Sequence, residues 1–448
     1  MNWRQRLAYG AADFSFSTTS TMVSVYLLIF LTDVVGLRPA LAGLVIFISR
    51  QWDWINDPIV GHLSDSTHTR FGRRRPFLLY GAIPFGVLFV LLWWNAPIAN
   101  PTLKAVFYAA VLVAYDTAAT LTYMPYFALT PELTHDYDER TTLTAFRMGF
   151  SIFGSLVAFT LPTVLVPTYT PEHADSIFKT GVVFAVVGIF LLLVTFFGTR
   201  ERSDIPIEKH PKLLSSFSAV FSNRPFLVSM GIHLFTWCAV DVLSGVMLYY
   251  LRYYLRRPEI SNLVFGTLFA TALLFLPFWT MFSKRKNKRL AYIIGIGFWM
   301  LVQLWIMILP TDTPVLTFIM MAFLAGIGVS AAHVLPWSII PDAIEWDELR
   351  TGQRREGAYY SIVMMAQKAI SGVVLLLIGV VLEWSGYVAN QPMQPANALL
   401  AIRLFTGLGP ALLLLCGIIF AALYPISREE HQKLRAQLKA RQNTNDTI

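Results

Sequence analysis

Residues 50–58 read RQWDWINDP, and they lie within residues 39–64, an apolar segment long enough to cross a membrane as a helix. Asp53 and Asp57 are four residues apart, so a helix places both carboxylates on one face, where they repel each other. An unpaired carboxylate near the centre of a bilayer costs at least about 2.5 kcal/mol. The stretch therefore predicts a membrane helix in which a bound cation or proton compensates the paired carboxylates.

The composition extends this prediction to the whole chain. Of the 448 residues, 55% are hydrophobic and only 14% are charged, which is too apolar for a soluble protein of this length. No apolar stretch shows the alternation of a membrane β-strand. We predict an all-α integral membrane protein with twelve transmembrane helices in two groups of six. The twelve predicted spans are residues 11–35, 39–64, 76–97, 105–130, 141–167, 180–198, 225–251, 260–282, 290–309, 313–342, 356–384 and 397–424.

The chain shows signs of an internal duplication. Residues 124–132 (MPYFALTPE) match residues 335–342 (LPWSIIPD) six helices later, and an acidic turn follows each. The prolines should bend both helices, either for a gate or for packing. The predicted parts are a first bundle (1–198), a cytoplasmic linker (199–224), a second bundle (225–424) and a cytoplasmic tail (425–448).

The basic residues predict the orientation. Most of the 35 lysines and arginines lie at the N-terminus, in the even-numbered connections or in the tail, so both termini should be cytoplasmic in a bacterial-type plasma membrane. This asymmetry accounts for the net charge of +8 without nucleic acid. No cleaved signal is expected. Cys238 and Cys416 lie inside predicted helices and are interpreted as small buried hydrophobic residues.

The connection between the second and third spans contains GHLSD (61–65) and RFGRRRP (70–76), which resemble the signature loop of the major facilitator superfamily. An aspartate facing a turn of arginines can latch neighbouring helices through charge-assisted hydrogen bonds, although a plain positive anchor is the alternative. The loop KRKNKR (284–289) keeps the charge without the Gly and Asp and favours the anchor. Gating or coupling roles are predicted for Arg50, Asp65, Arg73, Arg140 and Lys368.

Several hard oxygen donors accompany the paired carboxylates. Na⁺ or Li⁺ needs such donors in place of its water shell, and a proton would use the same carboxylates. A static salt bridge with Arg50 is the alternative, but Arg50 can neutralise only one carboxylate. An ammonium from Lys368 near the pair would neutralise it when no cation is bound. The predicted cation ligands are Asp53, Asn56, Asp57 and Thr120, with Asp53 and Asp57 as direct metal ligands.

Other polar and aromatic residues within the spans are candidates for substrate binding. Asp13 and Arg147 can bind the hydroxyls of a polar solute, and aromatic rings can stack on the apolar face of a sugar. Contacts with lipid or with the core are the alternative for these rings. The predicted substrate-binding residues are Asp13, Tyr123, Phe127, Arg147 and Lys368, and Trp54 is a further stacking candidate. For Asp116, Asp241 and Arg403 we favour interhelical pairing or positions facing water.

These segments resemble the glycoside-pentoside-hexuronide:cation symporters, the melibiose permease group. The similarity is strongest at YGAADF (9–14), at residues 26–33 and at residues 50–58, and it continues through TGQRREG (351–357) to Lys368. It implies the major facilitator fold of two six-helix bundles. It also implies that Asp53, Asn56, Asp57 and Thr120 bind the cation, that Asp13 and Arg147 contact sugar, and that Lys368 lies near both sites.

Two positions depart from this family pattern. Sugar-transporting members have an aspartate where this chain has Tyr123, and His333 stands where a tryptophan is expected. Facilitators that carry lysophospholipids also keep the paired acids and the lysine while losing that aspartate. We therefore expect Na⁺- or H⁺-coupled symport of a glycoside or similar small polar solute by alternating access, with sodium-dependent lysophospholipid transport as the alternative.

An enzyme or a receptor fits the sequence less well. The 8 histidines are scattered, no nucleophile with a base is evident, and no phosphate-binding Gly-x-x-x-x-Gly-Lys loop is present. A receptor would have little use for paired acids inside the membrane. We expect no cofactor besides the coupling ion. The expected partners are the solute, a monovalent cation and membrane lipids, and the expected state is a monomer.

Overall fold

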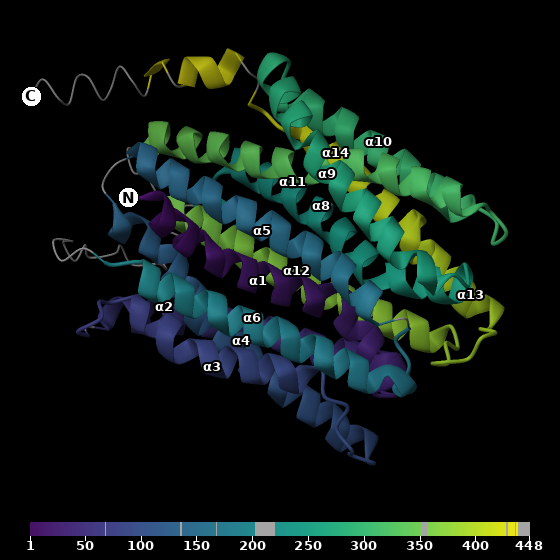
Figure 1. The fold of residues 1–448 in the computed structure, drawn as a ribbon. Coiled ribbons are helices and arrows are strands. Elements are labelled where there is room, and N and C mark those ends of the chain that lie inside the picture. The colour runs from purple at the N-terminus through teal and green to yellow at the C-terminus, as the bar shows by residue number, and fades with distance from the viewer. Residues whose placement is uncertain are drawn as a thin grey trace, which may run out of the picture. The chain divides into compact units, whose positions relative to one another are not determined.

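The computed structural model is almost entirely helical (Figure 1). Among the residues that it describes there is no strand, only an isolated bridge between Thr69 and Gly72. The all-helical prediction is confirmed. The described residues are 1–67, 69–134, 137–166, 168–201, 220–351, 356–426, 429–434 and 436–437. Most of the predicted linker and tail, and residues 352–355 of the family segment, lie outside them.

Long helices follow the predicted spans closely. The first half contains α1 (Trp3–Ile29), continued by the π-helix η1 (Phe30–Val34), then α2 (Pro39–Ser66), α3 (Arg75–Leu92), α4 (Pro101–Leu133), α5 (Tyr137–Leu165), the short η2 (Pro171–His173) and α6 (Ala174–Gly198). The second half contains α8 (Arg224–Tyr249), continued by the π-helix η3 (Tyr250–Tyr254), then the short η4 (Pro258–Ile260), α9 (Ser261–Arg285), α10 (Lys288–Ile308), α11 (Val315–Thr351), α12 (Glu356–Trp384), α13 (Ala396–Thr406) and α14 (Leu408–Leu423).

The last predicted span differs from the structure, because residues 397–424 form two helices. The break lies at Gly407, between α13 and α14. Pro410 explains it: proline has no amide hydrogen, so the helical bond to the carbonyl of Thr406 cannot form.

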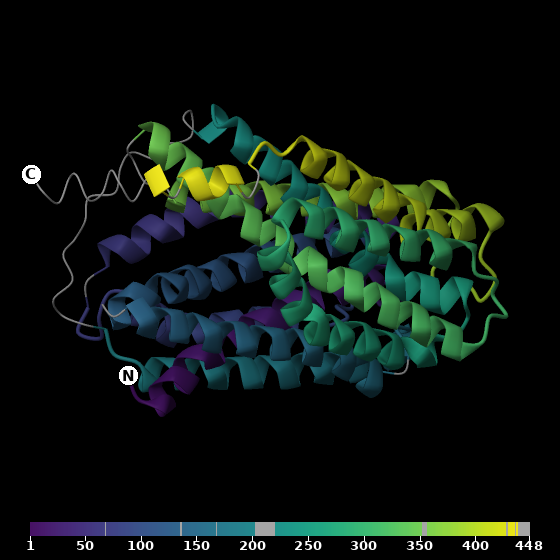
Figure 2. The same ribbon diagram turned by 90° about the horizontal axis from the view of Figure 1, so that it is seen from above.

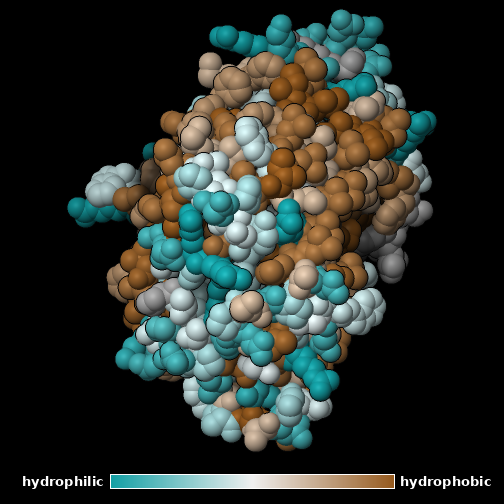
Figure 3. All heavy atoms as spheres, turned by 90° about the vertical axis from the view of Figure 1, so that its right-hand side faces the viewer, coloured by the Kyte–Doolittle hydropathy of each residue, from teal (hydrophilic) through white to brown (hydrophobic). Residues whose placement is uncertain are grey.

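Within the described residues, 11 helical segments are long and apolar enough to cross a membrane. The helix α2 is not among them, because polar side chains around Arg50, Asp53 and Asp57 lower its hydropathy. Large hydrophobic side chains are exposed on many helices, including Phe197 at 74% and Leu274 at 71%. Hydrophobic side chains also cover wide areas of the face drawn in Figure 3. Such surfaces suit a protein surrounded by lipid.

The chain divides into two compact units. Unit 1 contains Met1–Ile207, Ser244–Gly266 and Gly372–Ile402, and unit 2 contains Glu208–Leu243, Thr267–Ser371 and Arg403–Ile448. In unit 1, α1 packs against α5 and α6, α2 against α4, and α3 against α4 and α6 (Figures 1 and 2). In unit 2, α10 packs against α11 and α14. The division passes through α8, α9, α12 and α13, so each of these helices contributes to both units.

Small residues allow the close packing of α1 and α5. A Cβ atom added at Gly154 would meet the backbone carbonyl of Phe14 at 2.8 Å, and one added at Gly10 would meet the ring of Phe150 at 2.7 Å. Glycine is therefore needed at both positions, as is common where membrane helices touch. This packing brings Asp13 of α1 next to Arg147 of α5.

Candidate cation and substrate site

The predicted cation ligands lie where α2 packs against α4. Asp53, Asn56 and Asp57 share one face of α2, because they are spaced by three and four residues. The hydroxyl of Thr120 on α4 donates a hydrogen bond to Oδ1 of Asp57 at 3.2 Å. Asp53, Asn56 and Thr120 are all buried. The structure thus brings oxygen donors from both helices together, and their role as cation ligands remains a prediction.

Asp116 and Ser49 extend this polar cluster. The buried Asp116 of α4 accepts a hydrogen bond from the hydroxyl of Ser49 on α2. The carbonyl oxygen of Asp116 also lies 3.5 Å from the amide nitrogen of Asn56. Sequence reasoning favoured interhelical pairing for Asp116 but missed Ser49. The signal was the four-residue spacing of Ser49 with Asp53 and of Asp116 with Thr120, which places each pair on one helix face.

Asp13 and Arg147 form a buried ion pair. Nε of Arg147 donates to Oδ2 of Asp13 at 2.6 Å, and the hydroxyl of Tyr126 donates to the same oxygen at 2.9 Å. Nη2 of Arg147 is buried and has no hydrogen-bond partner among the described residues. A buried guanidinium nitrogen without a partner is costly. It can donate to a hydroxyl of a bound solute, as the predicted role of Arg147 requires.

Aromatic rings surround the ion pair of Asp13 and Arg147. The guanidinium carbon of Arg147 lies 3.7 Å from the centre of the Phe127 ring, and the Phe127 and Tyr123 ring centres are 4.1 Å apart. Phe16 packs edge-on against Tyr123 at 5.2 Å. Phe127 is 37% exposed, so its ring remains accessible. Trp54, the further stacking candidate, is 46% exposed.

Lys368, His333 and Arg50 occupy different places in the fold. Lys368 lies on α12 in unit 2, and its predicted position beside the carboxylates remains a prediction. His333 of α11, also in unit 2, packs its ring against Trp237 with centres 5.2 Å apart. Arg50 lies on α2 where α12 comes close, because a Cβ added at Gly372 would meet Cβ of Arg50 at 2.8 Å.

The arginines of the signature loop bind glutamates that sequence reasoning had not assigned. Arg73 and Arg74 both bind Glu132 at the end of α4, at 2.5 and 3.1 Å. The backbone amides of Arg73 and Arg74 donate to Glu201. The prediction named Asp65 as the acidic partner, but its side chain lies outside the described residues, as does that of Arg140.

A neighbouring ion pair ties the start of α1 to the start of α5. Arg6 binds Glu139 through two hydrogen bonds of 2.9 and 2.6 Å. The hydrogen bond from Arg6 lowers the pKa of the Glu139 carboxyl below its ordinary value.

In the second half, the corresponding loop also contacts an acidic residue of a long helix. Nζ of Lys288 binds both carboxylate oxygens of Asp342, at 2.7 and 2.9 Å. Asp342 and Glu132 stand at matching ends of the two repeated segments. The second loop was interpreted as a membrane anchor, and the structure adds this ion pair to it. Each of the two loops thus forms an ion pair with an acidic residue of its own half, and the duplication remains a prediction.

Comparison with known proteins places the chain in a family of transporters. Residues 8–428 match the family model described as MFS/sugar transport protein. The chain is 32% identical to an uncharacterized symporter of Synechocystis, over 99% of this chain and 98% of that protein. It is 28% identical to the sodium-dependent lysophosphatidylcholine symporter 1 of Gallus gallus, over 97% and 88%. It is 27% identical to the isoprimeverose transporter of Lactiplantibacillus pentosus, over 90% and 84%.

Solved structures show the same fold. The crystal structure of a D-xylose-proton symporter matches with a TM-score of 0.64 and 16% identity, covering 94% of this chain and 97% of that one. The predicted major facilitator fold is confirmed, and the protein is a membrane transporter rather than an enzyme.

Proposed function

The chain belongs to the MFS/sugar transport protein family, and on that premise we propose that it is a symporter that couples Na⁺ or H⁺ entry to uptake of a glycoside or another small, sugar-like solute. The proposal includes alternating access of a binding site inside the membrane. The similarity to symporters and to an isoprimeverose transporter supports it. The functional unit is a monomer in the plasma membrane, with both termini in the cytoplasm.

The observation that carries the proposal is the placement of both candidate sites along α4. Thr120 contacts the carboxylate of Asp57 on α2. One to two turns later, Tyr126 and Phe127 contact the Asp13–Arg147 pair, and Tyr123 packs on Phe127. A cation held between α2 and α4 fixes the position of α4. Solute binding to the adjacent residues then differs between the cation-bound and cation-free states, which is what coupling requires.

The chemistry of the second site suits a polar ring. Nη2 of Arg147, which has no hydrogen-bond partner among the described residues, offers a donor. Asp13 offers acceptor lone pairs, and Phe127 offers an accessible apolar face. Sugars present hydroxyls at their edge and C–H groups on their faces, so this combination matches them.

Lysophospholipid transport is the second candidate. The relevant observation is Tyr123, which packs with Phe16 and Phe127 and makes this part of the site aromatic. The similarity to sodium-dependent lysophosphatidylcholine symporters points the same way. A zwitterionic headgroup would use the charges of Asp13 and Arg147, while its acyl chain would need an apolar path.

Uptake into proteoliposomes tests both candidates. A mixed pool of glycosides, uronides and lysophospholipids is offered under an inward Na⁺ gradient, under an inward H⁺ gradient or under no gradient, and the contents are identified by mass spectrometry. We expect a glycoside to accumulate under one of the two gradients. Accumulation of lysophospholipid alone would establish the second candidate, and absence of any gradient-driven accumulation would contradict both. Liposomes without protein are the control.

A further inference from the structure

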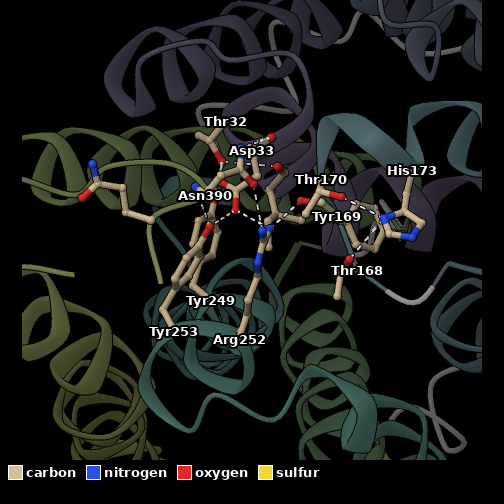
Figure 4. A network of polar contacts seen from close by, with 12 residues as sticks. Thr32, Asp33, Thr168, Tyr169, Thr170, His173, Tyr249, Arg252, Tyr253 and Asn390 are labelled. Carbon is tan, nitrogen blue, oxygen red and sulfur yellow. Dashed lines mark hydrogen bonds and ion pairs between the residues drawn. The ribbon is translucent and has the colours of Figure 1, made fainter. Parts of the chain in front are cut away.

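A second buried carboxylate, remote from the paired acids, organises a dense polar cluster. Asp33 lies in η1 at the end of the first helix and has 0% exposure. Its Oδ2 accepts hydrogen bonds from Nη1 of Arg252 at 2.7 Å and from the Tyr253 hydroxyl (Figure 4). Its Oδ1 accepts from the hydroxyls of Tyr387 at 2.6 Å and Thr32 at 2.8 Å. Both carboxylate oxygens are thus satisfied by protein groups.

A second ring of contacts closes around this carboxylate. Nδ2 of Asn390 donates to the backbone oxygen of Asp33 at 2.6 Å, and Oδ1 of Asn390 accepts from Nη2 of Arg252 at 2.8 Å. Arg252 also donates to the backbone oxygen of Tyr169. Asn390 has a φ of 62°, a left-handed conformation that asparagine tolerates better than most residues. The loop between α12 and α13 is therefore shaped to reach Asp33.

These contacts join segments from both halves of the chain. Asp33 and Tyr169 belong to the first half, whereas Arg252 and Tyr387 follow Asp33 by 219 and 354 residues. All of them lie in unit 1, which combines the first half with Ser244–Gly266 and Gly372–Ile402 of the second.

The ion pairs of Glu132 on α4 and of Asp342 on α11 behave differently. Arg73 with Glu132 joins segments of the first half, and Lys288 with Asp342 joins segments of the second. The Asp33 cluster, at the opposite end of α1 from the N-terminus, instead ties the halves to each other.

Close packing of α2 and α12 reinforces the connection. The backbone amide of Ala40 donates to Oε2 of Glu383 at 3.0 Å. A Cβ at Gly379 would meet the carbonyl oxygen of Pro39 at 2.3 Å, and one at Gly43 would meet Cα of Leu376 at 2.9 Å. The two helices touch backbone to backbone, which leaves no passage between them at these positions.

We propose that Asp33 is the centre of a latch. The latch holds the transporter closed on the face where the C-terminal end of the first helix lies, and it opens whenever solute passes through that face. The proposal rests on the proposed function, because a carrier with alternating access must open each of its faces in turn. A polar latch suits this task. Its charged and hydroxyl groups regain water when the face opens, so a buried ion pair stabilises the closed state only modestly. The closed and open states can then lie close in free energy.

A cysteine beside the latch reports on its opening. Leu248 is 6% exposed and lines a cavity of about 20 Å³ next to Arg252 and Tyr169. The reporter is Leu248→Cys in a Cys238→Ser/Cys416→Ser background. Its labelling rate by a hydrophilic maleimide is measured in detergent micelles, where both faces are accessible and no substrate is needed.

The test compares latch variants with a matched carboxylate. We expect Asp33→Asn to speed labelling at least about tenfold, because it removes the charge that Arg252 binds. We expect Tyr387→Phe to speed labelling several-fold, because it removes one hydrogen bond to the Asp33 carboxylate. Asp175→Asn removes an exposed carboxylate, 72% accessible and paired with Lys179, and should leave the rate unchanged. Tyr387→Phe keeps the test decisive if Asp33→Asn does not fold.

Unchanged labelling in a folded latch variant would overturn the latch. A lower melting temperature without faster labelling would likewise identify the cluster as structural only. Faster labelling of the latch variants, together with no solute accumulation by the wild-type protein, would preserve the latch and refute the symporter proposal. The two failures are therefore distinguishable.

Discussion

Two buried aspartates of unit 1 show how the surroundings of a residue separate the proposed roles. Asp13 pairs with Arg147 beside accessible aromatic rings, where a solute hydroxyl can compete for the charges. Asp33 pairs with Arg252 and is saturated by neighbouring hydroxyls, so only a conformational change can release it. We therefore propose that the same ion-pair chemistry serves binding in one place and gating in the other.

Asp53 tests the cation site. Asp53→Asn removes one negative charge from the face shared with Asp57, so a cation or proton loses part of its binding energy. We expect the variant to equilibrate solute without accumulating it above the external concentration. Gradient-driven uptake into proteoliposomes measures this, with Asp175→Asn as the control. Accumulation that survives Asp53→Asn would remove Asp53 from the coupling mechanism.

Arg147 tests the substrate site. Arg147→Lys keeps the charge but loses the planar group that binds Asp13, stacks on Phe127 and retains an unpartnered nitrogen. We expect kcat/KM for solute uptake to fall about ten- to a hundredfold, the effect of losing one hydrogen bond to a charged group. Initial rates over a range of solute concentrations give this value. Wild-type kinetics in the lysine variant would exclude direct solute contact through the guanidinium.

At the scale of helices, close contacts between elements explain the positions of several glycines. The helices α2 and α12 touch where Gly43 and Gly379 remove side chains from the contact. By contrast, no atom of the residues that the structure describes lies within 4 Å of a Cβ added at Gly61 on α2. The helix packing, rather than local propensity, determines which glycine is required.

This difference gives a matched pair of stability predictions. Gly379→Ala forces a methyl group against the backbone of Pro39, and overpacking of this kind costs about 1–3 kcal/mol. Gly61→Ala meets no neighbour and should be neutral or slightly stabilising, because alanine is the better helix former. Thermal unfolding in detergent, followed by fluorescence, should show a lower midpoint for Gly379→Ala only. Equal midpoints for the two variants would contradict the close approach of α2 and α12.

At the scale of the whole molecule, four helices contribute to both compact units. The helix α12 carries Lys368 in unit 2 and continues from Gly372 into unit 1, where it packs against α2. A rearrangement of one unit must therefore be accommodated along α12. Lys368 lies about one turn before the boundary, and its response to occupation of the cation site remains a prediction.

Lys368 provides the prediction at this scale. Lys368→Ala removes the ammonium that we expect to neutralise the carboxylates when no cation is bound. The variant should lose concentrative uptake while still exchanging solute across the membrane. Uptake and counterflow assays measure the two activities, and Lys179→Ala, at a residue 72% exposed, is the control. Normal concentrative uptake in Lys368→Ala would assign this lysine a structural role.

The sequence by itself determined the membrane class, the helices and the family, and it predicted the duplication. Hydropathy and helix periodicity are properties of contiguous residues, so they can be read without knowing the packing. The shared face of Asp53, Asn56 and Asp57 follows from the same periodicity. Even the break between α13 and α14 had a local signal, because Pro410 removes one backbone hydrogen bond of the helix next to Gly407.

Only the tertiary structure decided which side chains meet. The partners of Asp33 are far away in the sequence, and nothing near residue 33 indicates Tyr387 or Asn390. The same holds for Ser49 with Asp116 and for Glu132 with the loop arginines. The physical reason is that a buried polar group must find a partner, while the identity of that partner depends on how the helices pack.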